Sequence, residues 1–240
     1  MKQKMMIIFL TLFSMIGLSY SQTSNSANVD KVLKQLNIQR TDCYFDLVVE
    51  QTIPYSPDKS VIVIPKIIEK DENSFSCDCY VLIINNASGL IINKFFEPNS
   101  LISDAVRIDK ISIDFAPYKI NSTTRAFGIR ILNEGSSRPN PYENEEISLF
   151  IPKDSLLVRV LRRYSISSIT GEWDTNCEGQ FVSEKKVLII SDKATNNYFD
   201  IIVKNKITTT NKTLVNNDCM DIDTVNTKTT ILKYDNNGYK

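Results

Sequence analysis

Histidine is absent from all 240 residues of this sequence. Its absence excludes Ser-His-Asp and Cys-His catalysis, zinc peptidases of the HExxH type and every metal site that uses imidazole. Glycine is scarce, with seven residues, and tryptophan occurs once. Basic and acidic residues balance at 28 each, so the chain has no excess positive charge with which to bind a nucleic acid backbone. Carboxylates, lysine, tyrosine, serine and cysteine remain as candidates for chemistry.

The N-terminus has the order of features that is typical of a secretory signal peptide. Two lysines precede the apolar run 5–18, which is shorter than the roughly 20 residues of a membrane span, and small residues follow it. We expect residues 1–21 to be the signal peptide, 22–29 a polar linker and 30–240 a single all-β domain. The sequence therefore predicts an exported protein, periplasmic or secreted, with no membrane span in its mature chain.

Five cysteines follow the predicted signal peptide: Cys43, Cys77, Cys79, Cys177 and Cys219. In an oxidising compartment some of them pair, and an odd number leaves at least one thiol unpaired within the chain. Cys77 and Cys79 point the same way on a strand, and a bond between them would be strained. We expect Cys177 to pair with Cys219, and Cys43 with Cys77 or Cys79. A structural zinc site at the CxC pair is the alternative.

Short runs of β-branched and aromatic residues, separated by turn residues, make up most of the chain. We expect one short helix over about 31–36, followed by about twelve strands with no helical pattern between them. Parallel strands need crossover connections, so an antiparallel sheet is expected. The fold class is therefore all-β, either a β-sandwich or an open barrel. The polar stretch 206–228 is expected to be a long loop.

Two segments of the sequence resemble each other and leave a second fold open. Tyr44–Val49 reads YFDLVV and Tyr198–Val203 reads YFDIIV. Repeated strand units indicate a small β-propeller, which is the alternative fold. Two copies make no series, however, and the sandwich or barrel is preferred.

The lone tryptophan lies between two carboxylates. Glu172 and Asp174 are two residues apart, so on a strand they face the same way at roughly 7 Å, a separation found in inverting glycosidases. Trp173 could stack on a sugar ring. These three residues are a candidate carbohydrate site, with a glycan hydrolase as the stronger form of the same hypothesis. The alternative is a core tryptophan between two solvated acids.

Asp218, Asp221 and Asp223 give the stretch before the C-terminus a high density of oxygen ligands. Calcium binds six to eight oxygens, and an acidic loop can supply several of them. The spacing does not match an EF-hand. Calcium is therefore the one cofactor that the sequence suggests, and a solvated acidic loop is the alternative.

Two basic or aromatic positions indicate recognition of a partner. Arg138 and Tyr142 are residue types favoured in binding hot spots, and prolines restrict the loop between them. Arg159, Arg162 and Arg163 are the densest basic cluster, but strict alternation puts the first and last on one face and Arg162 on the other. We expect Arg138 and Tyr142 to contact a partner.

Four segments carry a family resemblance: Arg125–Arg130, Gly135–Arg138, Gly171–Asp174 and Thr230–Asp235. With these segments, the stretch of about 80–240 resembles a group of uncharacterised secreted bacterial proteins. The resemblance implies a bacterial envelope or secreted protein. It implies no activity, because none is attached to the group.

The function expected from the sequence is that of an exported, non-catalytic binding or envelope-structural module. Its partner would be an envelope protein or polysaccharide, and neither nucleic acid nor a membrane span is expected. A carbohydrate- or calcium-binding module is the first alternative. A hydrolase with a carboxylate pair is the second.

Overall fold

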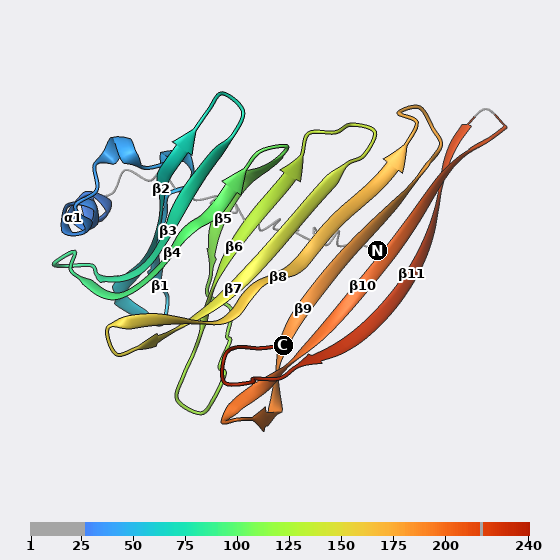
Figure 1. Cartoon of the computed structure of the whole chain (residues 1–240). Coiled ribbons are helices and arrows are strands. Elements are labelled where there is room, and N and C mark those ends of the chain that lie inside the picture. The colour runs from blue at the N-terminus through green and yellow to red at the C-terminus, as the bar shows by residue number, and fades with distance from the viewer. Residues whose placement is uncertain (1–26, 217) are drawn as a thin grey trace, which may run out of the picture.

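A computed structural model describes residues 27–216 and 218–240, and the predicted signal peptide lies outside the described residues. The described chain forms one sheet of eleven strands with a short α-helix before it (Figure 1). The prediction of an all-β barrel or sandwich is confirmed. The elements are α1 (Ala27–Leu36), η1 (Arg40–Asp42), η2 (Phe45–Leu47), β1 (Val49–Ile53), β2 (Ser56–Lys70), β3 (Phe75–Asn85), β4 (Ile91–Ser103), β5 (Val106–Asp114), β6 (Phe127–Gly135), β7 (Tyr142–Lys153), β8 (Leu156–Trp173), β9 (Gly179–Thr195), β10 (Tyr198–Val215) and β11 (Asp218–Leu232).

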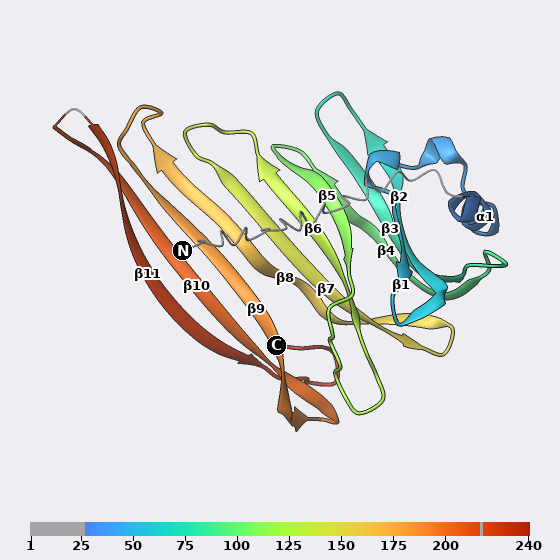
Figure 2. The same cartoon turned by 180° about the vertical axis from the view of Figure 1, so that it is seen from behind.

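The strand order is β1-β2-β3-β4-β8-β7-β6-β5, and β9, β10 and β11 continue the sheet from the second half of β8. All neighbours are antiparallel except β4 and β8, which pair in parallel through the single residue pair Lys94 and Leu156. The prediction of a purely antiparallel sheet is wrong at this contact. The order curls until β1 contacts β5, so this part of the sheet nearly closes into a barrel (Figures 1 and 2).

Side chains from both halves of the sheet fill the barrel. The rings of Phe127 and Phe150 stack at a centroid distance of 5.9 Å, and Phe95 from β4 meets Phe150 edge-on at 5.0 Å. Aliphatic residues at alternate positions of β2, β3, β5 and β6 complete this core. A cavity of about 30 Å³ beside Cys79 leaves room for about one water molecule. The described barrel is thus packed rather than hollow at this level.

The helix α1 packs on the outer face of β2 and β3. Val29 and Val32 are fully buried there, at the spacing that places them on one side of a helix. Both faces of β2 are therefore covered, which explains its uninterrupted apolar run Val61–Ile64. The helix contains Ala27–Val29, so this end of the predicted linker 22–29 is helical, and residues 22–26 lie outside the described residues.

A second core lies on the opposite face of β7 and β8. Ile147 of β7 packs there with Ile201 of β10, and the segment between β5 and β6 covers part of it. The C-terminal tail closes the core through Tyr239. Its backbone N–H donates to the carbonyl of Val160, and its hydroxyl donates to the carbonyl of Phe199, both at 2.7 Å.

The strands β9, β10 and β11 form an arm at the end of the sheet away from α1 (Figure 2). β10 and β11 pair without a break from Ile201 and Leu232 to Val215 and Asp218. The prediction of a loop over 206–228 is therefore wrong. This stretch is rich in threonine, which is β-branched and favours strands despite its polarity. In the described chain β11 pairs with β10 alone, and all its residues except Leu232 are exposed.

The disulfide expected between Cys177 and Cys219 is present, with 5.5 Å between their Cα atoms. It ties the β8–β9 turn to the start of β11. Cys43, Cys77 and Cys79 are buried and unbonded. Cys77 and Cys79 face the barrel interior, whereas Cys43 packs with α1 on the outer face. Because the sheet lies between them, the predicted second disulfide is wrong.

The two similar sequence segments do not form equivalent structures. Tyr44–Val49 contains the 3-10 turn η2, whereas Tyr198–Val203 lies in β10. The two segments are therefore similar in sequence only and are not copies of a repeated structural unit. A β-propeller, the alternative fold, is wrong because its separate blades do not exist in this single continuous sheet.

Candidate functional site

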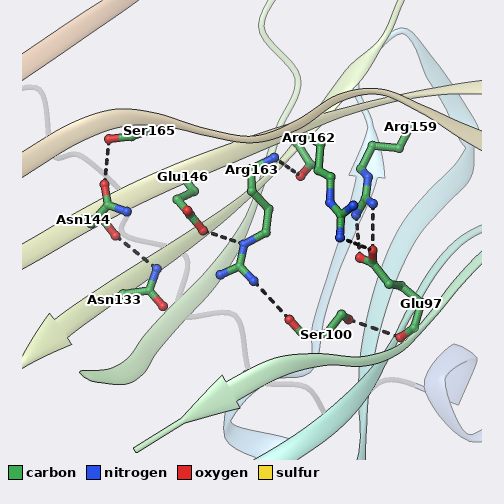
Figure 3. Close-up of polar contacts among 10 residues, drawn as sticks. Glu97, Ser100, Asn133, Asn144, Glu146, Arg159, Arg162, Arg163 and Ser165 are labelled. Atoms are coloured by element: carbon green, nitrogen blue, oxygen red, sulfur yellow. Dashed lines mark hydrogen bonds and ion pairs between the residues drawn. The ribbon is translucent and has the colours of Figure 1, made fainter. Parts of the chain in front are cut away.

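β4 and β8 separate beyond their one paired position, and polar side chains join them there. We call this region the seam. Asn93 of β4 donates from Nδ2 to the carbonyl of Asp154 at 2.7 Å. Further along β4, the carboxylate of Glu97 meets the guanidinium of Arg159 in β8, with distances of 2.5 Å for Nη1–Oε2 and 2.7 Å for Nη2–Oε1 (Figure 3). Side chains, rather than a backbone ladder, hold the two strands together.

A β-bulge in β8 determines where the arginines of the seam point. The pairing of β7 with β8 shifts register on both sides of Leu149, which leaves Arg162 and Arg163 between successive pairs. Arg163 adopts a left-handed backbone with φ of 40°. Its N–H donates to the hydroxyl of Ser148 at 3.0 Å instead of joining the ladder. The side chains around the bulge therefore do not alternate strictly.

The bulge gathers the arginine side chains around two carboxylates. Arg162 Nη2 lies 3.2 Å from the Oε1 atom of Glu97, the acid that already pairs with the first arginine of the cluster. Arg163 donates from Nε to Glu146 at 2.6 Å and from Nη1 to the carbonyl of Ser100 at 3.2 Å (Figure 3). Alternation placed Arg162 on the face opposite the other two. That prediction is wrong, because the extra residues of the bulge reset the alternation.

The arginines keep the main carboxylate of the seam ionised. The hydrogen bond from Arg159 lowers the pKa of Glu97 below its usual value, against the opposing effect of partial burial. Asp104 adds a third carboxylate to Glu97 and Glu146. Three acids and three arginines leave this region close to neutral overall.

The seam opens into a cleft of about 480 Å³, which we call the seam cleft. Most of its wall is polar. Tyr142 contributes an aromatic ring that is 38% exposed, and the side chain of Arg162 at the rim is 72% exposed. The lining residues are Glu97, Asn99, Ser100, Ile102, Asp104, Val106, Asn133, Tyr142, Asn144, Glu146, Arg162 and Arg163.

Two asparagines are fixed on one wall of the cleft. Asn133 donates from Nδ2 to the carbonyl of Asn144 at 3.3 Å. The hydroxyl of Ser165 donates to Oδ1 of Asn144 at 2.7 Å (Figure 3). These bonds orient both amides. Nδ2 of Asn144 and Oδ1 of Asn133 form no hydrogen bond with the described residues, so they are a donor and an acceptor for a ligand.

The thiol of Cys79 lies directly behind the seam in the small barrel cavity, which Glu97 and Arg159 also line. Burial, followed by the negative charge of Glu97, raises its pKa to about 12. A thiol with this pKa is almost entirely protonated at neutral pH and is a poor nucleophile. Cys79 therefore contributes packing to the seam, and the polar groups provide its chemistry.

No protein family, curated protein or solved structure matches this chain. Within the described residues, none of the helices has the length and apolar character needed to cross a membrane. What the seam can bind has to be derived from its own side chains.

The predicted carbohydrate site around Trp173 has other contacts in the structure. The indole N–H of Trp173 donates to the carbonyl of Arg138 at 2.7 Å and anchors the β6–β7 loop. Asp174 accepts hydrogen bonds from the backbone N–H groups of 176–178, and these bonds lower its pKa. Glu172 is exposed. Trp173 and Asp174 thus support local turns, and sugar binding or hydrolysis at this place stays a prediction.

The two predicted partner-binding residues lie in different surroundings, Arg138 within the β6–β7 loop and Tyr142 at the start of β7. Tyr142 begins β7 and lines the seam cleft. Arg138 is exposed in the loop and does not line the cleft, although its carbonyl holds Trp173. The structure thus places one of the two residues, Tyr142, next to the arginines of the seam.

The predicted calcium ligands lie on a strand and not on a loop. Asp221 pairs with Lys212 at 2.7 Å, and Asp223 accepts a hydrogen bond from Thr210 at 2.6 Å. Alternation along β11 turns Asp218 to the other face. No group of three acidic or cysteine residues suited to a metal ion occurs among the described residues. The loop on which the calcium hypothesis depended does not exist.

Several residues of the cleft were not recognisable from the sequence. Glu97, Asn133, Asn144 and Glu146 lie in strands and carry no motif. The one available signal was the presence of three arginines within five residues of an otherwise strand-like segment. Such a cluster requires carboxylates nearby, but their positions follow from the strand order.

Proposed function

We propose that the protein is an exported, non-catalytic binding module that holds a polyhydroxylated ligand, a segment of an envelope polysaccharide, in the seam cleft. The supporting observation is the composition of this cleft. Fixed donors and acceptors are mixed around one exposed aromatic ring, and the three carboxylates of the lining are balanced by Arg162, Arg163 and the neighbouring Arg159. Export is supported by the signal-peptide pattern of residues 1–21 and by the disulfide between Cys177 and Cys219.

A sugar matches this set of groups better than an ion does. Each hydroxyl can both donate and accept, so it can use Nδ2 of Asn144 and Oδ1 of Asn133 together. A phosphate or sulfate would need an excess of positive charge, but Glu97 and Glu146 already pair with the arginines. The ring of Tyr142 supplies an apolar face for the carbon skeleton of a sugar.

The electrostatics of the seam favour binding over hydrolysis. Glycosidases need one carboxylic acid with a raised pKa to protonate the leaving group. The pKa of Glu97 is lowered, because Arg159 donates two hydrogen bonds to it. Glu97 is therefore ionised at neutral pH and acts as an acceptor for ligand hydroxyls.

Thermal unfolding with a panel of envelope polysaccharide fragments tests the proposal. A ligand at a hundred times its dissociation constant stabilises a protein by about 2.7 kcal/mol, which gives a clear rise in melting temperature. We expect at least one fragment to produce this rise. Tyr142→Ala should weaken the binding about tenfold through loss of its ring contact.

The matched control is Tyr55→Ala, which removes a tyrosine that is 44% exposed and does not line the cleft. It should bind the fragment as the unaltered protein does. A panel without any stabilising fragment would contradict the proposal. So would equal losses of affinity in the two tyrosine variants. The expectation of an envelope protein as partner would then be tested next.

A further inference from the structure

One face of the arm carries lysines and aliphatic side chains in four successive rows, which we call the lysine face. Residues directly opposite each other in a sheet lie on the same face. The rows across β9, β10 and β11 are Ile189–Ile202–Ile231, Val187–Lys204–Thr229, Lys185–Lys206–Thr227 and Ser183–Thr208–Val225. These twelve positions hold three lysines, five aliphatic residues, four hydroxyl residues and no acid.

The lysines lie close together without compensation. Lys206 is directly opposite Lys185, and Lys204 follows two residues along the same strand. Like charges in directly opposite positions destabilise a sheet. None of the three forms an ion pair with another described residue, whereas Lys186 on the other face pairs with Glu184 at 3.2 Å.

Acidic residues return only beyond the lysine face. Asp223 lies in the next row and accepts a hydrogen bond from Thr210. Asp221 lies one row further and is paired with Lys212. The positive charge of the lysine face is therefore separate from the tip of the arm, where Asp218, Asp221 and Asp223 outnumber Lys212.

The aliphatic residues around the lysines are exposed to solvent. Val187 is 60% exposed, Ile231 52% and Val225 51%. A nucleic acid would use aromatic residues for stacking, and a soluble acidic polymer gains nothing from aliphatic ones. Ammonium groups interspersed with aliphatic side chains match a bilayer surface, where anionic headgroups lie directly above the acyl chains.

We propose that the lysine face docks the arm on an anionic lipid surface. The ammonium groups of Lys185, Lys204 and Lys206 lie against the headgroups, and Val187, Val225 and Ile231 enter the interface. This surface is separate from the seam cleft, so it adds a membrane-bound location to whatever the cleft binds. Attraction of this kind weakens as salt screens the charges.

Flotation of the protein with vesicles tests the proposal. Vesicles of equal parts phosphatidylglycerol and phosphatidylcholine are compared with vesicles of phosphatidylcholine alone, at about 0.1 M salt. We expect binding to the anionic vesicles only. The variant Lys185→Gln/Lys204→Gln/Lys206→Gln should bind on the order of a hundredfold more weakly, from the known effect of each lysine near an anionic membrane.

The matched control is Lys34→Gln/Lys110→Gln/Lys153→Gln, which removes the same charge from exposed positions outside the arm. It should keep most of the binding. Equal losses in the two triple variants would overturn the proposal, since net charge alone would then explain the attraction. Absence of binding by the unaltered protein would overturn it as well.

A second pair of measurements identifies the source of the anion. Val187→Thr/Ile231→Thr keeps β-branched residues and all charges, and it should weaken vesicle binding. Undiminished binding of this variant, with equal binding to polyglutamate, would indicate an acidic polymer and overturn the lipid proposal. Inorganic phosphate should not compete with the vesicles. Tyr142→Ala should bind them normally, which separates this result from that of the cleft.

Discussion

Glu97 accepts two hydrogen bonds from Arg159, which lies 62 residues away in the sequence and on a strand that diverges from its own. The contact spans the point where β4 and β8 share a single residue pair. Its side chains are mostly buried, with 20% exposure for Glu97 and 14% for Arg159. At this place an ion pair between side chains holds two neighbouring strands together, whereas backbone hydrogen bonds do so elsewhere in the sheet.

Removal of one partner of this pair should destabilise the fold. Arg159→Met leaves the carboxylate of Glu97 with the long contact to Arg162 as its remaining ion pair. We expect a loss of about 2 kcal/mol in the free energy of unfolding, below the 3–5 kcal/mol of a fully buried pair because solvent reaches the seam. Urea unfolding measures it. The control Glu134→Gln, which breaks an exposed pair with Arg107, should leave the midpoint unchanged.

Stability should fall in acid through two carboxylates. Hydrogen bonds from Ala116, Tyr118 and Arg130 hold the pKa of Asp114 below its usual value although burial raises it, and Arg159 lowers that of Glu97. A lowered folded pKa stabilises the protein above the unfolded pKa, and this contribution is lost as pH falls through the folded value. We expect the urea midpoint to be flat between about pH 5 and 7 and to drop below about pH 4.

Asp114→Asn provides the test of that explanation. The variant should be less stable at neutral pH and should lose less stability on acidification, because one of the two linked groups is gone. An acid transition of unchanged steepness in this variant would show that other carboxylates cause it.

The three unbonded cysteines should not react in the folded protein. Burial raises the pKa of Cys43 and Cys77 to about 11 and that of Cys79 to about 12. Thiolate is the reactive form, so a neutral thiol reagent at pH 7.5 should label none of them until urea unfolds the chain. Mass spectrometry counts the labels. Rapid labelling of even one thiol under native conditions would contradict the burial of this region.

The disulfide should stabilise the tip of the arm more than the barrel. Its residues are 42 positions apart, which the chain-entropy estimate converts to about 4 kcal/mol. We expect the arm to open while the barrel stays folded, so Cys177→Ser/Cys219→Ser should cost less than this in global stability. Hydrogen exchange should accelerate at the β10–β11 end. Uniform acceleration across β2 and β3 would contradict this picture.

Patterns of short strands predicted the all-β class, because β-branched residues fit a pleated surface whatever the strand order. The same logic failed for 206–228, where threonine and asparagine gave no apolar alternation. A strand that is exposed on both faces has no buried side, so its sequence shows no alternation of apolar and polar residues. The disulfide between Cys177 and Cys219 was expected as a preference and is present, although the exclusion of a Cys77–Cys79 bond did not by itself select it.

The seam cleft was largely unpredictable from the sequence. Tyr142 was singled out as a residue type common in binding sites, and it does line the cleft. Arg162 was assigned to the wrong face because a bulge cannot be seen in the spacing of three arginines. Glu97 could be matched with Arg159 only once the parallel contact between β4 and β8 was known.

The packed interior of the barrel has a consequence for the timing of binding. With Phe95, Phe127 and Phe150 filling that space, a ligand in the seam cleft stays at the outer surface and in touch with water. It can enter and leave without any strand moving aside, so its residence time depends on its contacts alone. The polysaccharide binding that we propose for the cleft would then be a rapid, repeated capture along a polymer with many identical units, and not the carriage of one sheltered cargo.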